Sequence, residues 1–475
     1  MKIDGRMEDH ALEPVPQHLR QGWLKLSWNT AGIVTTLVQL FLGALTTFAA
    51  GFKIAMAAGV FVAIIGTAIG WACGHIAFKT GLSSTVMARH HGFGKRGSLI
   101  GSLIFGFMII GFLALENALL YAGFRFALGF QDTLASKVVV YGILTAAWIF
   151  LTAYGFEAVS KVSTYTLVAF VGLLLFITWR VVSSYADGHI FDFPALFPPD
   201  VLASLGATSD LGKFIFCTNV FIGAAGALAL VDADLGRYAR SSVDIGAAAA
   251  VGNFSAQICM VFVGGVFMYA AMGELVTHYT TVMQMAPDAA QKLAMSPEGV
   301  TAAFLLFGGG IGVALMVLAQ GKAQVLNTYS GSLALSNLFD AVGLRMNRVV
   351  MVVIANVIGL LMVGFGILDQ FNAWIEILGV ITTAFAGIMI VDYFIVSGKV
   401  GGRGLPSTEL VNWAGVVTTV VATILAHFVL NKIVTIQFFT SLGVSVILYP
   451  ALRLSLFRPG LASGAGGPTT SEPIS

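Results

Sequence analysis

A positive charge and several polar side chains interrupt an otherwise apolar stretch, VLAQGKAQVLNTYSG (317–331). At helical spacing these polar side chains form one stripe, made of Gln320, Gln324, Asn327 and Thr328. Lys322 is two positions from Gln324, which turns it about 200° around a helix of 3.6 residues per turn. A buried ammonium is costly in hydrocarbon, so Lys322 needs a partner inside the protein or a route for its side chain to the headgroups.

A carboxyl group lies in a second apolar stretch, GFMIIGFLALENALL (106–120). Glu116 follows Phe112 by four residues, so a ring and a carboxyl group share one helix face. A carboxylate accepts two parallel N–H bonds, which suits the edge of an aminopyrimidine or aminopurine. It can instead take up a proton, because desolvation disfavours its charged form, or be satisfied by a neighbouring helix. Gln39 is the one amide in TTLVQLFLGAL, and either ligand contact or an interhelical hydrogen bond explains it.

Enzyme and channel chemistry find no support in the residue pattern. The eight histidines are not clustered with carboxylates inside apolar stretches, and no HExxH, G-x-S-x-G or Walker sequence occurs. No series of charged rings typical of a pore is present. We therefore expect no catalytic residues, no cofactor and no metal-ligand set.

The composition is that of an integral membrane protein. Of 475 residues, 57% are hydrophobic and 10% are charged, against roughly 25% charged in a soluble protein. The net charge of +2 provides no basic field for nucleic acid. The lipid bilayer is therefore the expected surroundings of the chain.

Apolar segments long enough to cross a bilayer, about 20 residues each, predict twelve transmembrane helices. Their ranges are 26–50, 54–78, 98–128, 138–156, 160–183, 212–233, 246–272, 301–337, 347–366, 371–396, 410–430 and 434–455. The proline-containing region 184–211 is too polar to cross and is expected outside the membrane. Residues 1–25 and 456–475 read as a polar tail and a disordered tail.

Lysines and arginines set the expected orientation. With the N-terminus inside, 17 of the 25 lie on the cytoplasmic side. An even number of spans then returns the C-terminus to the cytoplasm of a cell inner or plasma membrane.

The first and sixth spans contain small residues that predict interruptions. They are GALTTFAAG (43–51) and GAAGALALVDAD (223–234). Close helix packing is one explanation. The other is a transporter built from two inverted repeats, because paired breaks five spans apart supply backbone dipoles to a substrate site.

Four motifs in order resemble one family. They are the leading PVPQHLRQG, KTGLSSTVMARHHGFGKRGS (79–98), DADLGRYARSS (232–242) and GIMIVDYFIV (387–396). Together they resemble the nucleobase–cation symporter-1 family, in its cytosine- and purine-permease branch. The resemblance covers about residues 15–400, and the last two spans match in position alone.

The resemblance implies an all-α, leucine-transporter-like fold. Two inverted repeats of five helices would occupy residues 26–183 and 212–396, followed by two peripheral helices over 397–455. Substrate would lie near the midplane between the first, third, sixth and eighth spans.

The resemblance also assigns site residues. The stacking aromatic falls on Phe112, where most relatives of this branch have tryptophan, and Glu116 falls where some have glutamine. The second aromatic is best matched by Phe221. The expected substrate-binding set is therefore Gln39, Phe112, Glu116, Phe221, Gln324 and Thr328.

In sodium-coupled relatives, two hydroxyl residues that bind sodium occupy the positions of Lys322 and Ala323. An ammonium there repels a sodium ion at close range. We therefore expect Lys322, with Ala323 and Ala319, to replace the sodium site and to tie the eighth span to the unwound part of the first.

The motif residues have a structural or gating interpretation. Charged and hydroxyl side chains at the inner ends of spans can form turns and ion pairs, with Asp234, Arg237 and Arg240 as an expected latch. This set is Thr80, Gly81, Arg89, Asp234, Arg237, Arg240 and Asp392.

The sequence therefore predicts secondary uptake of a nucleobase-like heterocycle, cytosine or a purine, by alternating access, coupled to protons rather than sodium. The alternative keeps the fold and changes the ligand to a hydantoin, allantoin, a thiamine precursor or a vitamin B6 compound.

Overall fold

A computed structural model describes residues 14–154, 156–185, 188–344, 346–397 and 409–458. Within these ranges the regular structure is helical, apart from one isolated bridge between Gln21 and Ala239. No strand is present in the described chain. A bilayer favours helices, because a helix satisfies its own backbone hydrogen bonds.

The helices follow the predicted spans closely. Their bounds are α1 Trp23–Val34, α2 Leu37–Ala50, α3 Phe52–Thr80, α4 Ser84–His90, α5 Leu99–Leu128, α6 Leu134–Tyr154, α7 Phe156–Ser184, α8 Pro199–Ser204, α9 Asp210–Gly236, α10 Ser242–Phe254, α11 Met260–Thr281, α12 Pro287–Ala294, α13 Pro297–Ala341, α14 Arg348–Gly364, α15 Phe371–Val391, α17 Trp413–Ile424 and α18 Gln437–Leu454. Short π-helical turns, Ser255–Cys259, Asp392–Val396 and Leu425–Val429, continue α10, α15 and α17.

In the part of the chain that is described, nine helices are long and apolar enough to cross a membrane. The bent pair α1–α2 makes ten if it is counted as one span. Two shorter apolar helices, Arg348–Gly364 and Trp413–Val429, lie where the ninth and eleventh spans are predicted. The region before α9, predicted to lie outside the membrane, holds the short helix α8.

The first span is broken, but not where its glycines predicted. The chain bends by 66° between α1 and α2, at Thr35 and Thr36. Thr36 is extended (φ −132°, ψ 168°), and the Thr35 hydroxyl donates to the Ala31 carbonyl at 2.5 Å. Two consecutive β-branched residues with backbone-bonding hydroxyls weaken a helix at this point. Gly43 instead allows close packing of α2 on the backbone of Val261.

The predicted interruption of the sixth span is wrong, because α9 runs as one helix over all 27 residues. The glycines of α9 permit close packing against a neighbouring helix. A Cβ at Gly223 would overlap the Ile375 carbonyl, and one at Gly226 would overlap the Thr382 hydroxyl. Both partners belong to α15, so the small residues allow the close helix approach that is common in membranes.

The eighth span, α13, is a kinked helix of 45 residues. Gly309 is the kink, with φ 55° and ψ −147°, a conformation that glycine tolerates best. The polar stripe predicted from the sequence lies in the second half of this helix, beyond the kink.

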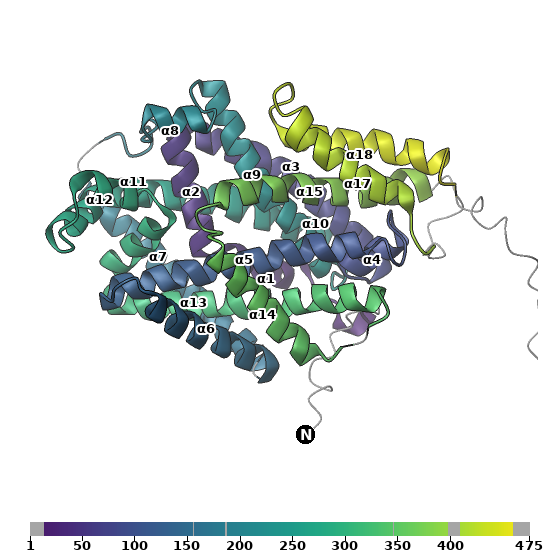
Figure 1. Cartoon of the computed structure of the whole chain (residues 1–475), viewed down its shortest axis with the longest axis horizontal. Coiled ribbons are helices and arrows are strands. Elements are labelled where there is room, and N and C mark those ends of the chain that lie inside the picture. Colours follow the sequence, from purple (N-terminus) through teal and green to yellow (C-terminus); the bar gives the residue numbers. More distant parts are fainter. Residues whose placement is uncertain (1–13, 155, 186–187, 345, 398–408, 459–475) are drawn as a thin grey trace, which may run out of the picture.

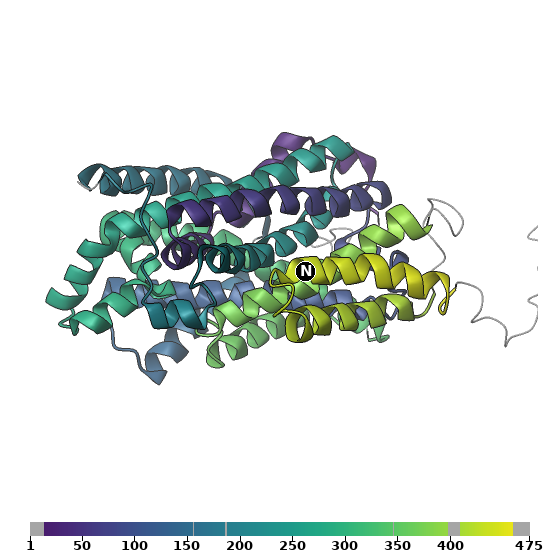
Figure 2. The ribbon, with the colours of Figure 1, turned by 90° about the horizontal axis from the view of Figure 1, so that it is seen from above.

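Most of the long helices lie side by side, and α2 crosses them steeply, as Figure 1 shows. The last two helices, α17 and α18, lie along one edge of the molecule in both views and pack on α15 (Figures 1 and 2). The break between α1 and α2 is enclosed by α5, α9 and α13, and this is where the site lies.

Candidate substrate site

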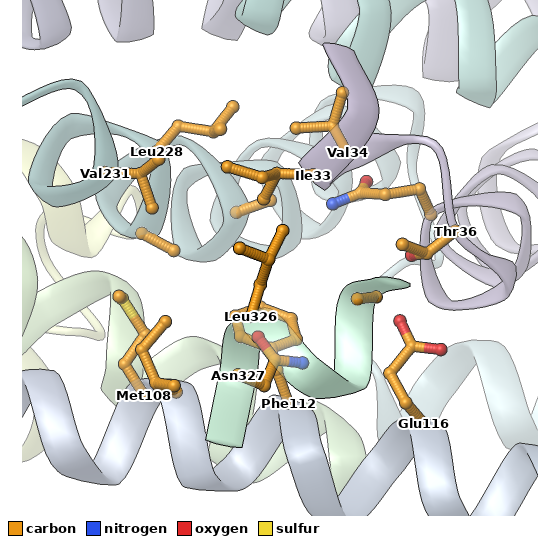
Figure 3. Close-up of a pocket in the computed structure, with 15 residues that line it drawn as sticks. Ile33, Val34, Thr36, Met108, Phe112, Glu116, Leu228, Val231, Leu326 and Asn327 are labelled. Atoms are coloured by element: carbon orange, nitrogen blue, oxygen red, sulfur yellow. The ribbon is translucent and has the colours of Figure 1, made fainter. Parts of the chain in front are cut away.

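A cavity of about 60 Å³ lies where the break in the first span faces three long helices. A single water needs about 10–15 Å³ on this scale, so the cavity has room for a group larger than one water. Figure 3 shows α1 and the break on one side, with α5 and α13 opposite. The lining residues are Ile33, Val34, Thr36, Gln39, Met108, Ile109, Phe112, Glu116, Ala224, Ala227, Leu228, Val231, Ala323, Leu326 and Asn327.

These residues come from α1–α2, α5, α9 and α13, the four segments that the resemblance implied. Apolar side chains form most of the wall, and four polar side chains interrupt it: Thr36, Gln39, Glu116 and Asn327. A mostly apolar cavity with a few convergent polar groups is typical of a small-molecule site.

Gln39 lies in the first turn of α2, directly after the break, and its side chain is buried (7% exposed). Its carbonyl oxygen Oε1 is buried with no hydrogen-bond partner in the described chain. An unsatisfied buried acceptor costs about 1–3 kcal/mol, so it requires an explanation. A ligand that donates an N–H to Oε1 would supply one.

Glu116 is almost fully buried, at 2% exposed, and it is held by donors from two other helices. The Gln320 amide of α13 donates to Oε2, and the Thr36 hydroxyl also interacts with the carboxyl group. Figure 3 shows this carboxyl group turned toward Thr36. An ionised carboxyl group has about four acceptor positions, so two donors from the protein leave capacity for a ligand.

Phe112 lies one turn before Glu116 and presents its ring to the cavity. Trp374 of α15 packs against the ring, edge to face, with centroids 5.0 Å apart. This packing limits ring motion, and aromatic pairs of this geometry contribute about 0.5–1.5 kcal/mol beyond their buried area. The ring is therefore a supported stacking surface.

On α13 the cavity is lined by Ala323 and Asn327, not by Gln324. The Gln324 amide donates to the Leu113 carbonyl at 3.0 Å and to Asn117 Oδ1 at 2.7 Å, both on α5. Gln324 therefore joins two helices, and we replace it with Asn327 in the candidate site. The spacing alone could have identified Asn327, because it lies one helical turn after the small residue Ala323 and therefore on the same face of α13.

Two other expected contact residues also lie away from this cavity. Thr328 faces α14, where Asn356 donates to its hydroxyl at 3.5 Å. Phe221 is fully buried near Gly59 of α3, and its carbonyl accepts a bond from Gln257 at 3.4 Å. The part of α9 at the cavity carries alanine, leucine and valine, so Phe112 is the one aromatic residue in the described wall.

Lys322 faces away from Gln324, as the helical spacing predicted, and its side chain reaches α1. A Cβ at Gly32 would overlap Lys322 Nζ and lie 3.3 Å from Leu167. No charged partner acts on this ammonium among the described residues. Because α1 ends at Val34, its last carbonyl groups lack the donors that a continued helix would supply, except that of Ala31, which accepts from Thr35. The neighbouring Ala319 lies in α13, but its side chain is outside the described residues.

The first motif forms the end of α3 and the turn after it. Gly81, at φ +72°, ends α3, and the Thr80 hydroxyl bonds back to the Ile76 carbonyl at 3.0 Å. Arg89 forms an ion pair with Asp340 near the end of α13, at 3.1 Å. These contacts lie outside the cavity.

The second motif connects backbone groups. Asp234 accepts from the Ser84 backbone N–H at 2.7 Å, and Arg237 donates to the Asp234 carbonyl at 3.2 Å. Arg240 donates to the Arg20 carbonyl at 3.1 Å, beside the bridge that joins the N-terminal segment to residue 239. Arg237 also acts electrostatically on the Asp234 carboxyl group, so these two members of the expected latch face each other, while Arg240 bonds to a backbone carbonyl.

The third motif is a buried polar network. Asp392 accepts from the Tyr449 hydroxyl at 2.5 Å and lies 3.0 Å from His91 Nδ1. Asn412 donates to the same hydroxyl at 3.1 Å, so the network joins α15, α17 and α18 to the turn after α4.

The described residues hold no group of three or more His, Cys, Asp or Glu that could hold a metal ion. The chemistry available at the cavity is therefore stacking on one ring, hydrogen bonding to two amides, a hydroxyl and a carboxyl group, and proton uptake by that carboxyl group. These are binding functions, with no nucleophile–base pair among the lining residues.

Residues 14–446 match the profile of a family described as permeases for cytosine/purines, uracil, thiamine and allantoin. The match spans nearly the whole chain. The protein belongs to this family. It is accordingly a multi-pass membrane protein and a secondary transporter, not an enzyme. No curated protein sequence matches it.

Solved structures show the same fold. The inward-facing conformation of Mhp1 aligns with a TM-score of 0.71 and 18% identity, covering 94% of this chain and 93% of that chain. A closed conformation of Mhp1, a nucleobase-cation-symport-1 family transporter with bromovinylhydantoin bound, aligns at 0.65 and 19%, covering 94% and 96%. A mutant manganese transporter of Eremococcus coleocola aligns at 0.51 and 14%, covering 94% and 97%. The predicted all-α, leucine-transporter-like fold class is confirmed.

Proposed function

We propose that this permease imports a small planar heterocycle of the nucleobase type, cytosine or a purine, across the cell membrane by alternating access. The observation that carries the proposal is the buried, unpartnered Gln39 Oε1, which lines the same cavity as the Phe112 ring and the Glu116 carboxyl group. A flat ring with N–H groups on its edge meets all three. It stacks on Phe112, donates to the two oxygens, and buries its polar edge with partners.

Recognition in this proposal depends on the cost of leaving polar groups unpaired. An analogue without an N–H opposite Gln39 or Glu116 leaves a buried acceptor unsatisfied, at about 1–3 kcal/mol each. Asn327 offers both a donor and an acceptor from α13, so it can pair with a ring carbonyl or a ring N–H. The small cavity favours a base over a nucleoside.

Coupling in this proposal uses protons, with Lys322 in the place of a sodium ion. Nζ lies against the last turn of α1, and the carbonyl groups that follow Ala31 there are ligands of the kind that sodium requires. An ammonium donates hydrogen bonds to such carbonyls and repels a second cation by several kcal/mol at close range in a low dielectric. Lys322 then holds α13 against α1 with no bound ion.

A second ligand class is favoured by the wall itself. One aromatic ring, Phe112, faces the cavity, and α9 adds no second ring among the described lining residues. A ligand held by stacking on one face and by edge hydrogen bonds is as well matched by a hydantoin or allantoin ring as by a nucleobase. Thiamine precursors and vitamin B6 compounds complete this alternative.

A thermal-shift screen of the purified protein against cytosine, purines, uracil, hydantoin, allantoin and pyridoxine tests the proposal. We expect one planar class to raise the melting temperature, because a ligand that binds the folded state stabilises it by mass action. The shift should disappear in Phe112→Ala and persist in Phe107→Ala, which removes a more exposed ring from the same helix. No shift with any ring, or an equal shift in both variants, would contradict the site.

A further inference from the structure

Asp232 is a second buried carboxyl group, and it lies outside the substrate cavity. Its side chain is fully buried in α9 (0% exposed), one residue after the cavity-lining Val231. Neither Oδ1 nor Oδ2 has a hydrogen-bond partner in the described chain. Glu116 differs in this respect, because it accepts from both Gln320 and Thr36.

The Asp232 carboxyl group lies in a groove of glycines on α3. Gly66, Gly70 and Gly74 are spaced by four residues and form one stripe of that helix. A Cβ at Gly70 would overlap Asp232 Oδ2 and lie 3.2 Å from the Ala249 methyl group of α10. The carboxyl group is therefore packed directly against the backbone of α3 and has no exposure to solvent.

The groups around Asp232 do not stabilise a negative charge. From α3 it faces the thiol of Cys73, and from α10 the neighbouring side chains are Ile245, Ala249 and Asn253. No positive side chain acts on Asp232 among the described residues. Asn253 donates to the Ala249 carbonyl at 3.0 Å, and its own Oδ1 is also buried without a partner.

Three acceptor oxygens in this groove therefore lack a donor: both oxygens of Asp232 and Oδ1 of Asn253. An isolated buried carboxylate costs far more than a neutral acid, which is why such groups take up a proton. A proton on one Asp232 oxygen removes the charge and also turns an unsatisfied acceptor into a donor.

We propose that Asp232 is a proton-binding site of this permease, occupied by a proton while α9 lies packed in the glycine groove of α3. Water reaches the carboxyl group when α9 separates from α3, the proton leaves to that water, and the carboxylate forms. The part of the inference that makes this proton the coupling ion rests on the proposed transport function. The occupancy of the site does not.

Infrared spectroscopy of the purified protein at neutral pH tests occupancy directly. We expect the carbonyl stretch of a protonated carboxyl group in the wild type, lost in Asp232→Asn. That variant preserves the shape of the neutral acid, so it is expected to fold. Glu376→Gln, which removes another partly buried carboxyl group on α15, is the matched control and should leave the Asp232 band in place. A spectrum unchanged in Asp232→Asn would overturn the proposal.

Transport in proteoliposomes tests the coupling part, with radiolabelled cytosine as the probe. Asp232→Asn should still exchange cytosine at equal pH on both sides and should lose accumulation driven by a pH gradient. A residue with a merely structural role would keep both, since asparagine mimics the neutral acid. If Asp232→Asn keeps gradient-driven accumulation, the coupling role is overturned. If the wild type does not transport cytosine, the proposed substrate is contradicted, and the infrared result alone then decides whether Asp232 binds a proton.

Discussion

Two buried carboxyl groups, Glu116 and Asp232, show how the surroundings of a residue set its chemistry. Glu116 accepts bonds from α13 and from the break in the first span, and it faces a cavity. Asp232 faces glycines, aliphatic side chains, the Cys73 thiol and Asn253, and it accepts no hydrogen bond in the described chain. The donors beside Glu116 offset part of the cost of burying its charge and leave acceptor positions for N–H groups, whereas nothing beside Asp232 offsets that cost.

Replacing Glu116 by glutamine tests the role of its charge. The glutamine side chain would present one acceptor in place of an anionic pair, so binding of an aminopyrimidine edge should weaken by about 1.5–3 kcal/mol, the contribution of a hydrogen bond to a charged group. Isothermal titration with cytosine measures this loss, and Glu376→Gln should bind as the wild type does. If E116Q binds and transports normally, Glu116 is neither a ligand contact nor a proton carrier.

Spacing from a single sequence located part of this site. Gln39, Phe112 and Glu116 were predicted at the cavity, and the structure places all three in its wall. The sequence places Asn327 on the polar stripe but favours Gln324 as the ligand contact. Both amides lie on that stripe, and which one faces a cavity depends on the rotation of α13 against α5, which spacing does not determine.

Among the helices, the link between α1 and α13 decides how the broken span is held. Gly32 provides the space into which Lys322 Nζ extends, and the chain bends by 66° a few residues later. A side chain at residue 32 would displace the ammonium from the end of α1. This contact is the structural basis for expecting coupling without sodium.

Two measurements test this link. Uptake of the ligand in sodium-free buffer should equal uptake in sodium, and strict sodium dependence would eliminate the idea that Lys322 replaces the ion.

Gly32→Ala should lower the melting temperature, because overpacking costs about 1–3 kcal/mol. Gly142→Ala, where a methyl group meets nothing within 4 Å, should leave stability unchanged or raise it, since alanine is the better helix former. Equal effects of both substitutions would contradict the packing of Lys322 against Gly32.

For the whole molecule, the motif residues tie separate parts of the bundle together. Asp392, Tyr449 and Asn412 join the two edge helices to α15, and the Arg89–Asp340 ion pair joins α4 to α13. All of these lie at the side of the protein that the lysine and arginine count assigns to the cytoplasm. The orientation itself is a proposal that rests on that count.

Labelling from outside the cell tests the orientation. Gln131 and Lys95 are both exposed, the first between α5 and α6 and the second before α5. A membrane-impermeant thiol reagent should label Gln131→Cys on intact cells, and Lys95→Cys only after the membrane is opened. The reverse pattern would place both termini outside.

The sequence by itself determined the membrane class, the approximate bounds of the spans and the family, because each depends on local composition, hydrophobic length or short motifs. The tertiary structure alone decided where the first span breaks, that α9 is continuous, and which residues of α13 face the cavity. Glycine illustrates the physical reason. The same residue type permits a kink at Gly309, close helix packing at Gly226 and the groove around Asp232, and the outcome depends on which helix lies opposite.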